Sequence, residues 1–306
     1  MEEAINLNSQ SIPEENSIQE KKQSKFSDIV QFTKFRLASL VVLSAALCYL
    51  FGATEINYSS LIMLVVGGFF VTAASNGFNQ IIEKDLDKLM NRTSKRPLPD
   101  GRMSLTEAYA ISITFGLVGL TILYIWLGLA CFLLGLFALA SYTLIYTPLK
   151  QKTPFAVFVG AFPGAIPPLL GYVAATGRFD VAAWLVFGIQ FLWQFPHFWA
   201  IAWVLDDDYK KAGFKMLPSK EGRDKNSAFQ IMVYTFSLIP IVLLPYYFHL
   251  TGITSTILNI IFGILFSYQA VKLYQDCSLK SAKNLMFGSF AYLPLVQLAM
   301  YIDKIN

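Results

Sequence analysis

The chain has 306 residues, of which 55% are hydrophobic, 15% aromatic and only 14% charged, and its mean hydropathy is +0.50. Soluble domains carry about 25% charged residues, so this composition excludes an ordinary soluble protein and indicates one whose apolar surface is covered by lipid. The apolar runs are long and continuous, unlike the alternating pattern of a membrane β-barrel. We therefore predict an all-α polytopic membrane protein, because about 300 residues accommodate eight to ten membrane helices of roughly 20 residues each.

The N-terminal residues 1–32 differ from the rest of the chain, because they are rich in glutamate, lysine, serine and asparagine and contain no apolar run. We expect them to form a disordered cytoplasmic tail, followed by a single domain over residues 33–306. The lack of an apolar segment near the start argues against a signal peptide, and the glutamates argue against a mitochondrial transit peptide. We therefore expect a bacterial cytoplasmic membrane, that is, a cell inner membrane.

Charge-free stretches of the sequence define the expected membrane helices. Two of them, residues 108–149 and 227–271, are each long enough for two crossings, and we predict turns within them at Gly128 and at residues 249–252. Five more stretches are each long enough for one crossing: residues 36–55, 55–83, 152–178, 180–206 and 283–303. Together they predict a nine-transmembrane-helix bundle.

The basic residues give this assignment an orientation. If the N-terminus is cytoplasmic, 22 of the 24 lysines and arginines lie on the cytoplasmic side, and only Arg178 and Lys304 lie outside. Loops on the cytoplasmic side of membrane proteins carry such an excess of positive charge. The C-terminus is then external, and the two longest charged loops, about residues 84–107 and 206–226, are both cytoplasmic.

The expected fifth and sixth helices contain proline, which shapes a helix bundle. Pro163, Pro167 and Pro168 lie in the fifth helix and Pro196 in the sixth. Proline removes a backbone hydrogen bond that lipid cannot replace, so the freed carbonyl must face protein or a cavity. Two interpretations stay open: tight packing of kinked helices, or the wall of a central cavity that opens toward the cytoplasmic side.

A first cluster of polar side chains follows the end of the second expected helix. Asn79, Glu83 and Asp87 are spaced by four residues, so on a continuing helix they form one polar face at the cytoplasmic edge of the membrane. Carboxylate and amide oxygens suit Mg²⁺, which typically takes one or two protein carboxylates and completes its shell with water and phosphate oxygens. Asp85 lies on the opposite side of the helix, where we expect it to be solvated.

Two further groups of charged residues lie on the same face of the membrane. Arg92 and Arg96, four residues apart, have the geometry to hold phosphate oxygens bidentately. The alternative for this first loop is an ordinary charged helix end with topological arginines, but the whole string favours a diphosphate site. The aspartates at 206–208 are either a solvated loop or, paired with the first cluster, a second metal-binding element.

Polar side chains also recur within the sixth expected helix. On an ideal helix Gln190 and Asp208 share one line, and Gln194 and His197 lie within about 40° of it. We expect this stripe to point toward the acidic cluster, with His197 about 16 Å below Asp208. Polar groups within a membrane are by default functional candidates, although a lone histidine is more often a satisfied residue of the bundle.

The two acidic clusters resemble the two aspartate-rich motifs of the UbiA-type intramembrane prenyltransferase superfamily. The similarity runs from about Thr33 to the end of the last helix. Further segments resemble the heme-farnesylating branch of that superfamily, the heme O synthases: residues 91–93, 96–98, 146–150, 164–169, 193–198, 208–209 and 213–218.

This resemblance implies a nine-helix enzyme that transfers farnesyl from farnesyl diphosphate to a vinyl group of heme b, giving heme O and diphosphate, by Mg²⁺-assisted ionisation of the allylic diphosphate. It also implies residue roles. The implied catalytic residues are Asn79, Glu83, Asp87 and Asp208, of which the last three hold Mg²⁺. The implied diphosphate contacts are Arg92, Arg96, Lys150 and Lys211, and the implied heme-binding residues are His197 and Gln194.

The sequence departs from the superfamily pattern at two places. Glu83 occupies a position where aspartate is common, so its longer side chain alters how the metal is held. The second cluster lacks an Asp-x-x-x-Asp spacing, which leaves open whether Asp206, Asp207 or Asp208 faces the metal.

Two alternative functions compete with heme farnesylation. A UbiA-type enzyme acting on an aromatic quinone precursor is disfavoured by the pairs Pro196-His197 and Asp208-Tyr209. A non-enzymatic membrane transporter does not account for paired acidic clusters and arginines on one face. The expected partners are farnesyl diphosphate, heme b, membrane lipid and a heme A synthase, and no nucleic acid is expected.

Overall fold

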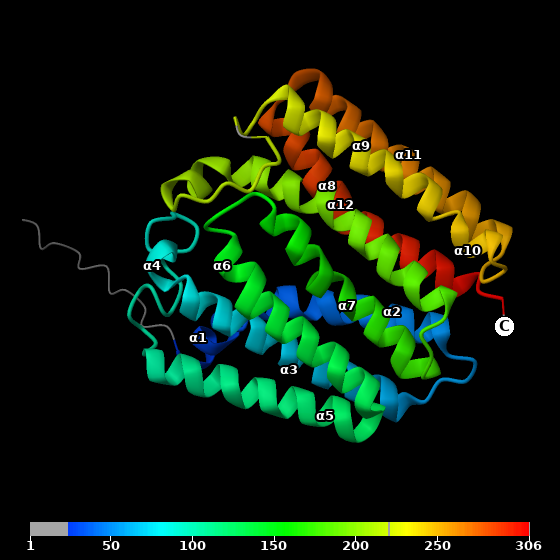
Figure 1. The fold of residues 1–306 in the computed structure, drawn as a ribbon, viewed down its shortest axis with the longest axis horizontal. Coiled ribbons are helices and arrows are strands. Elements are labelled where there is room, and N and C mark those ends of the chain that lie inside the picture. Colours follow the sequence, from blue (N-terminus) through cyan, green and yellow to red (C-terminus); the bar gives the residue numbers. More distant parts are fainter. Residues whose placement is uncertain (1–23, 220, 306) are drawn as a thin grey trace, which may run out of the picture.

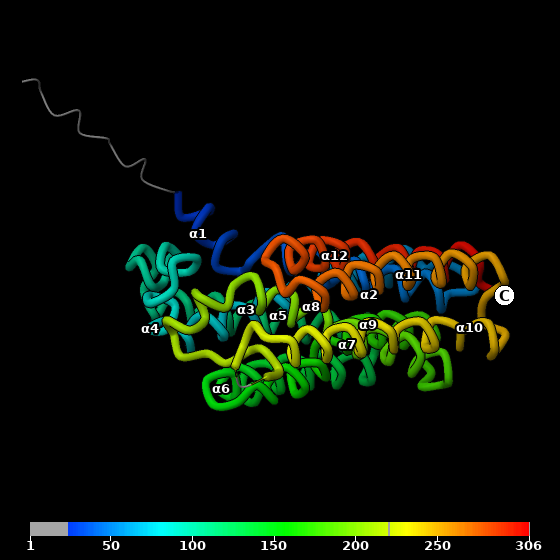
Figure 2. Tube along the Cα trace, turned by 90° about the horizontal axis from the view of Figure 1, so that it is seen from above, coloured from blue at the N-terminus to red at the C-terminus, as the bar shows by residue number. Residues whose placement is uncertain are grey.

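The computed structural model describes residues 24–219 and 221–305, which form a bundle of long helices lying side by side (Figures 1 and 2). These residues contain no strand, only one isolated bridge between Thr251 and Lys304, so the predicted all-α architecture is confirmed. In chain order the helices are α1 (Lys25–Phe32), α2 (Phe35–Gly52), α3 (Tyr58–Ile82), α4 (Lys84–Asp87), α5 (Leu105–Ala140), the π-helix η1 (Ser141–Tyr146), α6 (Thr147–Leu149), α7 (Ala156–Thr176), α8 (Val181–Lys211), α9 (Lys225–Ile241), α10 (Leu244–Tyr247), α11 (Ile253–Asp276) and α12 (Leu279–Ile302).

Eight segments of the described residues are long and apolar enough to cross a membrane. The buried share of each segment's most apolar stretch distinguishes inner from outer helices. It is 72% for α7 and 67% for α8, but 17% for the segment Leu105–Leu149. A helix that is apolar all round must be covered either by protein or by lipid. α7 and α8 are therefore covered mainly by other helices, whereas the segment that contains α5 presents most of its surface to lipid.

The 45-residue segment Leu105–Leu149 is a hairpin, because the chain turns back at Gly128. This glycine has φ 84° and ψ −179°, a conformation that residues with a side chain rarely adopt. The rings of Tyr124 and Phe132 lie 5.8 Å apart, and a Cβ atom at Gly135 would approach Leu123 to 2.6 Å. On a straight helix residues 12 apart are separated by about 18 Å, so the turn predicted at Gly128 is confirmed.

The number of crossings depends on this hairpin. Counting its two arms separately gives nine crossing segments within residues 24–219 and 221–305. The second predicted turn is also present, since α10 ends at Tyr247, α11 begins at Ile253, and His249 adopts a positive φ of 55°. The count of nine membrane crossings and the cytoplasmic opening of a cavity stay predictions.

Helix α1 corrects the prediction that the tail is disordered up to residue 32. The hydroxyl of Ser24 caps the helix by accepting a backbone N–H of its first turn, 3.2 Å away. The Phe32 side chain is fully buried, and the buried carboxylate of Asp28 pairs with Arg102. Eight residues are too few for a stable isolated helix, so these tertiary contacts, invisible in the composition, explain the difference. Residues 1–23 of the predicted tail lie outside the described residues.

Hydrogen bonds from α8 reach the backbone of the proline-containing helix α7. Pro168 has no N–H to offer the carbonyl four residues earlier, that of Gly164, and the side-chain amide of Gln190 donates to this carbonyl instead, 3.3 Å away. The side-chain amide of Gln194 donates to a second carbonyl of α7, that of Ala161, 2.9 Å away. Both glutamines therefore join α8 to α7, which confirms tight packing of these two helices.

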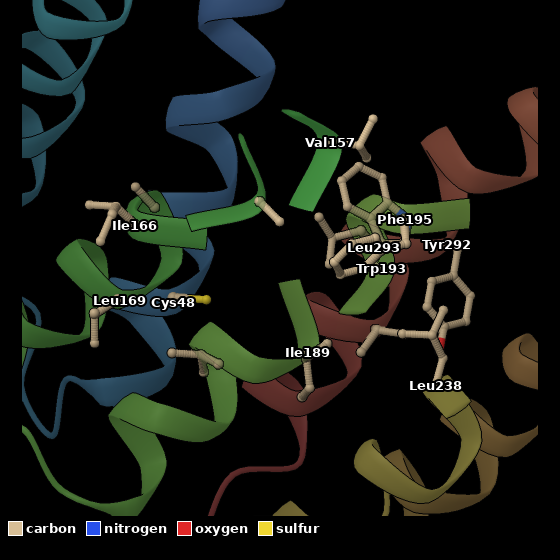
Figure 3. Packing of buried hydrophobic residues seen from close by; sticks show 14 of the residues in the cluster. Cys48, Val157, Ile166, Leu169, Ile189, Trp193, Phe195, Leu238, Tyr292 and Leu293 are labelled. Atoms are coloured by element: carbon tan, nitrogen blue, oxygen red, sulfur yellow. The ribbon is translucent and has the colours of Figure 1, made fainter. Parts of the chain in front are cut away.

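The packing is closest where glycine faces a neighbouring helix. A Cβ atom at Gly164 would lie 2.0 Å from the side-chain oxygen of Gln194, and one at Gly171 would lie 1.9 Å from the carbonyl oxygen of Ala45 in α2. Figure 3 shows the apolar side chains around this central part, including Cys48 of α2, Ile166 of α7 and Ile189 of α8. The core of the bundle is thus assembled around α7 and α8.

Candidate active site

The two charged loops meet at one end of the bundle. In Figure 1 helices α1, α4 and α6 gather at the left, whereas the C-terminal end of the described chain lies at the right. The view in Figure 2 agrees. The C-terminal end of α8 reaches the same end of the bundle, because the carboxylate of Asp208, in its last turn, accepts the backbone N–H groups of Asn91 and Arg92 at 2.8 and 3.0 Å. The structure therefore brings together the two clusters that the sequence places more than 100 residues apart.

The end of α3 presents Asn79 and Glu83. The helix does not continue to Asp87 as we predicted: it ends at Ile82, Glu83 has φ −96° and ψ 8°, and the short helix α4 begins afterwards. Backbone bonds still join every fourth residue, from the N–H of Glu83 to Asn79 and from that of Asp87 to Glu83. The three side chains consequently stay on one face although the helix is interrupted, and all three are buried.

Each carboxylate of this first cluster has a cationic partner. Lys150 contacts Glu83 at 2.6 Å, and the other oxygen of Glu83 accepts the Asn79 amide at 2.8 Å. Arg96 contacts Asp87 at 2.6 Å, with 13% and 1% of the two side chains exposed. The predicted residues Arg96 and Lys150 are thus in direct contact with the predicted metal ligands.

The helix that precedes Lys150 is locally widened. Residues Ser141–Tyr146 form a π-helix, a geometry that often accommodates a disturbance of the regular hydrogen bonds. Here Pro148 lacks an N–H group, and the hydroxyl of Thr147 donates to the carbonyl of Tyr142 at 2.9 Å. The same hydroxyl lies 3.4 Å from the Asn79 amide, which fixes the end of this segment beside α3.

Lys34 belongs to the cluster although the sequence interpretation assigned it only a topological role. It precedes α2 in a left-handed conformation (φ 51°, ψ 54°), and its ammonium donates to the side-chain oxygen of Asn79 at 3.4 Å. Burial, together with the nearby positive charges of Arg96 and Lys150, lowers the pKa of Lys34 to about 7. An unusual buried lysine of this kind marks a functional site more often than a surface lysine does.

We call Lys34, Asn79, Glu83, Asp87, Arg96 and Lys150 the charged cluster. Its composition suits an anionic ligand with a divalent cation, because three cations face two carboxylates. The second oxygen of Asp87, Oδ1, is buried and accepts no hydrogen bond. Burial raises the pKa of Asp87, and the neighbouring Arg96 opposes this rise. Such an uncompensated carboxylate oxygen fits a bound cation.

The three predicted metal ligands do not form one ready-made cage. Among the described residues there is no group of three His, Cys, Asp or Glu side chains arranged to hold a metal ion. Glu83 and Asp87 are neighbours, whereas Asp208 is engaged by the two backbone N–H groups and by Lys211 at 3.2 Å. Because Mg²⁺ typically takes only one or two protein carboxylates, Glu83 and Asp87 fit this ion without a third.

The aspartates at the end of α8 have different environments. Asp206 is buried and pairs with Lys210 at 2.7 Å, whereas Asp207 is 76% exposed and pairs with Arg223 at 2.9 Å. Only Asp208 contacts the loop that carries the arginines. Of the predicted diphosphate residues, Arg92 lies over the ring of Tyr209, 6.0 Å from its centre.

The predicted stripe on α8 divides between two neighbouring helices. Gln190 and Gln194 point to α7, whereas His197 contacts α12, with its Nδ1 atom 2.7 Å from the hydroxyl of Ser289. The imidazole stacks on Trp193 at a centroid distance of 4.3 Å. The two glutamines are engaged in packing α8 against α7. His197 is therefore the side chain of this stripe that is available for another role.

These features define a multi-pass helical membrane protein with a buried charged cluster at one end. The chain belongs to the UbiA prenyltransferase family, whose model matches residues 40–293. It is therefore an enzyme that transfers a prenyl group.

Individual relatives and solved structures agree with this family. The chain is 48% identical over 283 residues to the protoheme IX farnesyltransferase of Cytophaga hutchinsonii, covering 92% of this chain and 99% of the relative. The protein of the same name from Christiangramia forsetii is 46% identical over 286 residues, covering 92% and 94%. The fold is similar to that of a UbiA homologue from Archaeoglobus fulgidus bound to GPP and Mg²⁺, with a TM-score of 0.75, 17% identity and coverage of 90% and 98%. A digeranylgeranylglyceryl phosphate synthase structure gives a TM-score of 0.76 at 21% identity, covering 92% and 99%.

Proposed function

We propose that this enzyme transfers farnesyl from farnesyl diphosphate to a vinyl group of heme b, giving heme O and diphosphate. The observation that carries the proposal is the charged cluster, in which three buried or half-buried cations and two buried carboxylates gather at one end of an apolar bundle. The relatives named protoheme IX farnesyltransferase support heme b as the acceptor in preference to a quinone precursor.

The proposed reaction consumes farnesyl diphosphate, heme b and one water molecule. The bond between the allylic carbon and the diphosphate oxygen breaks, and its electron pair leaves with the diphosphate. The vinyl group of heme b supplies the electrons of the new carbon–carbon bond, and the oxygen of a water molecule adds to the remaining cationic carbon and loses a proton. The product carries a hydroxyethylfarnesyl group.

Residues of the charged cluster stabilise the leaving group in this proposal. Lys34, Arg96 and Lys150 contact the diphosphate, and their positive charge is already in place where negative charge develops. Arg92 and Lys211 line the approach through the neighbouring loops. Asn79 orients both Lys34 and Glu83, because its amide contacts each of them.

Mg²⁺ is held in this proposal by Glu83 and Asp87, and when bound it neutralises charge on the diphosphate. These carboxylates pair with Lys150 and Arg96 in the structure. Lys150 and Arg96 would be available to the diphosphate when Glu83 and Asp87 hold the ion. Asp208 contributes by holding the backbone at Asn91 and Arg92, so we assign it a positioning role next to its predicted role as a metal ligand.

The apolar part of the substrate has a suitable surface next to the cluster. A groove of about 410 Å³ between α2 and α3 begins at Phe35, directly after Lys34, and its lining is almost entirely apolar: Phe35, Ser39, Val42, Leu43, Ala46, Val65, Val66 and Phe69. A second, smaller cavity of about 40 Å³ lies deeper in the bundle. An apolar environment protects an allylic cation from premature capture by water.

The acceptor end is assigned to His197, with Gln194 as its neighbour on α8. At 1.5 Å per residue His197 lies about 16 Å along the helix from Asp208, a separation that leaves room for a prenyl chain between the diphosphate and the heme. A neutral imidazole can bind iron or accept a proton.

We further propose that the enzyme resides in the cell inner membrane with the charged cluster facing the cytoplasm and the C-terminus outside. The distribution of basic residues supports this orientation. A heme A synthase is the proposed partner that consumes the product.

Analysis of hemes by mass spectrometry tests the proposal. Cells that overproduce the chain should accumulate heme O, whereas cells with an empty vector should not. Purified enzyme should convert heme b only when farnesyl diphosphate and Mg²⁺ are both supplied. A prenylated aromatic quinone precursor together with unchanged heme b would instead identify the other branch of the family.

A further inference from the structure

Ser289 on α12 holds two aromatic side chains of α8 at once. Its backbone carbonyl accepts the indole N–H of Trp193 at 3.0 Å, and its hydroxyl lies 2.7 Å from Nδ1 of His197. The Ser289 side chain is fully buried, and both ring residues are 8% exposed. Figure 3 shows Trp193 of α8 within the buried cluster, beside Leu293, which lies on α12 like Ser289.

The direction of the hydrogen bond to His197 follows from a second contact. The Ser289 hydroxyl also lies 2.6 Å from the carbonyl oxygen of Met286, which can only accept. A hydroxyl has one proton to donate, so making both bonds requires that Ser289 donates to Met286 and accepts from His197. The proton of the neutral imidazole then sits on Nδ1, and Nε2 carries a free lone pair.

The surroundings of the ring fix its plane as well as its proton. Trp193 stacks on the imidazole with an interplanar angle of 17°, and the rings of Phe290 and Phe198 lie edge-on at 5.0 and 5.4 Å. Nε2 of His197 makes no hydrogen bond to any residue of the described chain. A fixed ring with one nitrogen engaged and the other unengaged is the arrangement by which proteins present histidine to a metal ion.

We infer that Ser289 is a positioning residue that locks His197 in its Nδ1–H tautomer and so presents the Nε2 lone pair to the iron of the porphyrin acceptor. The tautomer rests on the geometry alone. The identity of the acceptor rests on the proposed function.

The tautomer can be measured without any substrate. The chain has only two histidines, and His249 lies in an exposed turn with a positive φ of 55°, a conformation that asparagine tolerates. In the His249→Asn variant, ¹⁵N NMR of histidine-labelled protein reports His197 alone. We expect a protonated Nδ1 and a bare Nε2. A proton on Nε2 would overturn the inference.

Variants of Ser289 test what the lock does. Ser289→Ala removes the acceptor and should allow the Nε2–H tautomer to appear. Ferric heme affinity, followed by absorption, should fall about 10- to 100-fold, the usual effect of losing a partner of a metal-binding histidine. Ser289→Thr retains the hydroxyl and should retain the tautomer and most of the affinity. Ser267→Ala is the matched control, because Ser267 is a buried serine whose hydroxyl has no hydrogen-bond partner.

Two outcomes separate this inference from the proposed function. If His197 carries its proton on Nδ1 but His197→Ala leaves heme affinity unchanged, the heme-binding role proposed for His197 fails and the tautomer assignment stands. If the proton sits on Nε2 while heme O is still formed, the role of Ser289 fails and the proposed reaction stands. Farnesyl diphosphate affinity should remain unchanged in all Ser289 variants.

Discussion

Asp87 is the residue whose environment ties the charged cluster most directly to a cation. Its side chain is almost completely buried, one oxygen pairs with Arg96 and the other has no hydrogen-bond partner. Asp87→Asn should lower turnover by at least about 100-fold, because an amide is a neutral and much weaker ligand for Mg²⁺ than a carboxylate. Turnover measured against Mg²⁺ concentration checks this. Asp85→Asn is the matched control, since Asp85 is 72% exposed; unchanged turnover and Mg²⁺ dependence in Asp87→Asn would refute the assignment.

Lys34 leads to a prediction about pH. The lysine is half-buried and its pKa is lowered to about 7, so it is charged below this pH and becomes neutral as the pH rises through it. Affinity for farnesyl diphosphate should therefore fall as pH increases from about 6 to 8. Lys34→Met should bind at least about tenfold more weakly at pH 6 and lose much of this dependence.

The Lys34 experiment needs a reference for other titrating groups. The charges that face Lys34 are Arg96, Lys150, Glu83 and Asp87, and the ligand itself ionises, so the wild type and the variant should be compared at each pH by isothermal titration. The lowered pKa of Lys34 also affects the stability of the fold. Between pH 7 and the ordinary lysine pKa the unfolded chain holds more protons than the folded chain, so the free energy by which Lys34 destabilises the fold is smallest at high pH. A parallel pH dependence in both proteins would exclude Lys34 from the site.

At the scale of the helices, close contact between α2 and α7 depends on Gly171. A Cβ atom there would lie 1.9 Å from the carbonyl oxygen of Ala45, a backbone atom that cannot rotate away. Gly171→Ala should destabilise the bundle by about 1–3 kcal/mol or more, as overpacking does. Gly116→Ala is the matched control, because its Cβ would have ordinary contacts at 3.6 Å and alanine favours the helix by roughly 1 kcal/mol. Thermal unfolding in detergent should separate the two variants; equal melting temperatures would contradict this packing.

Long apolar runs predicted most helix positions correctly, because covering some 20 apolar residues in lipid leaves few alternatives to a helix. The turn at Gly128 was predictable for the same reason. The break at Glu83 and the helix α1 were not, since both depend on tertiary partners such as the ion pair between Asp28 and Arg102.

The candidate site was predictable in its residue types more than in its contacts. The spacing of four residues predicted that Asn79, Glu83 and Asp87 lie on one face of a helix, and in the structure the three side chains do lie on one face and are buried. The sequence analysis missed Lys34, because no local pattern distinguishes a lysine that contacts the charged cluster from one that only adds positive charge to the cytoplasmic side. The metal-binding role of Asp208 stays a prediction, whereas its contacts with the backbone N–H groups of Asn91 and Arg92 and with Lys211 are ones that a sequence does not display.

For the whole molecule, the decisive property is the number of times the chain passes from one end of the bundle to the other. Helix α1 and the charged loops lie at one end and the C-terminal end of the described chain at the other (Figure 1), which requires an odd number of passes. Cysteine labelling tests this in cells. In a Cys277→Ser background, since Cys48 and Cys131 are already buried, a membrane-impermeant maleimide should react with Ile305→Cys from outside.

Asp85→Cys, at the exposed edge of α4, should react only after the cells are opened. Both positions should label equally in opened cells, which controls for accessibility. Labelling of both positions in intact cells would mean an even number of crossings. The two arms of the hairpin at Gly128 would then not count as two separate membrane crossings. Labelling of Asp85→Cys alone would retain nine crossings but place the charged cluster outside, on the side opposite to the one proposed for substrate access. The predicted pattern therefore tests the fold and the access of substrate to the site in one measurement.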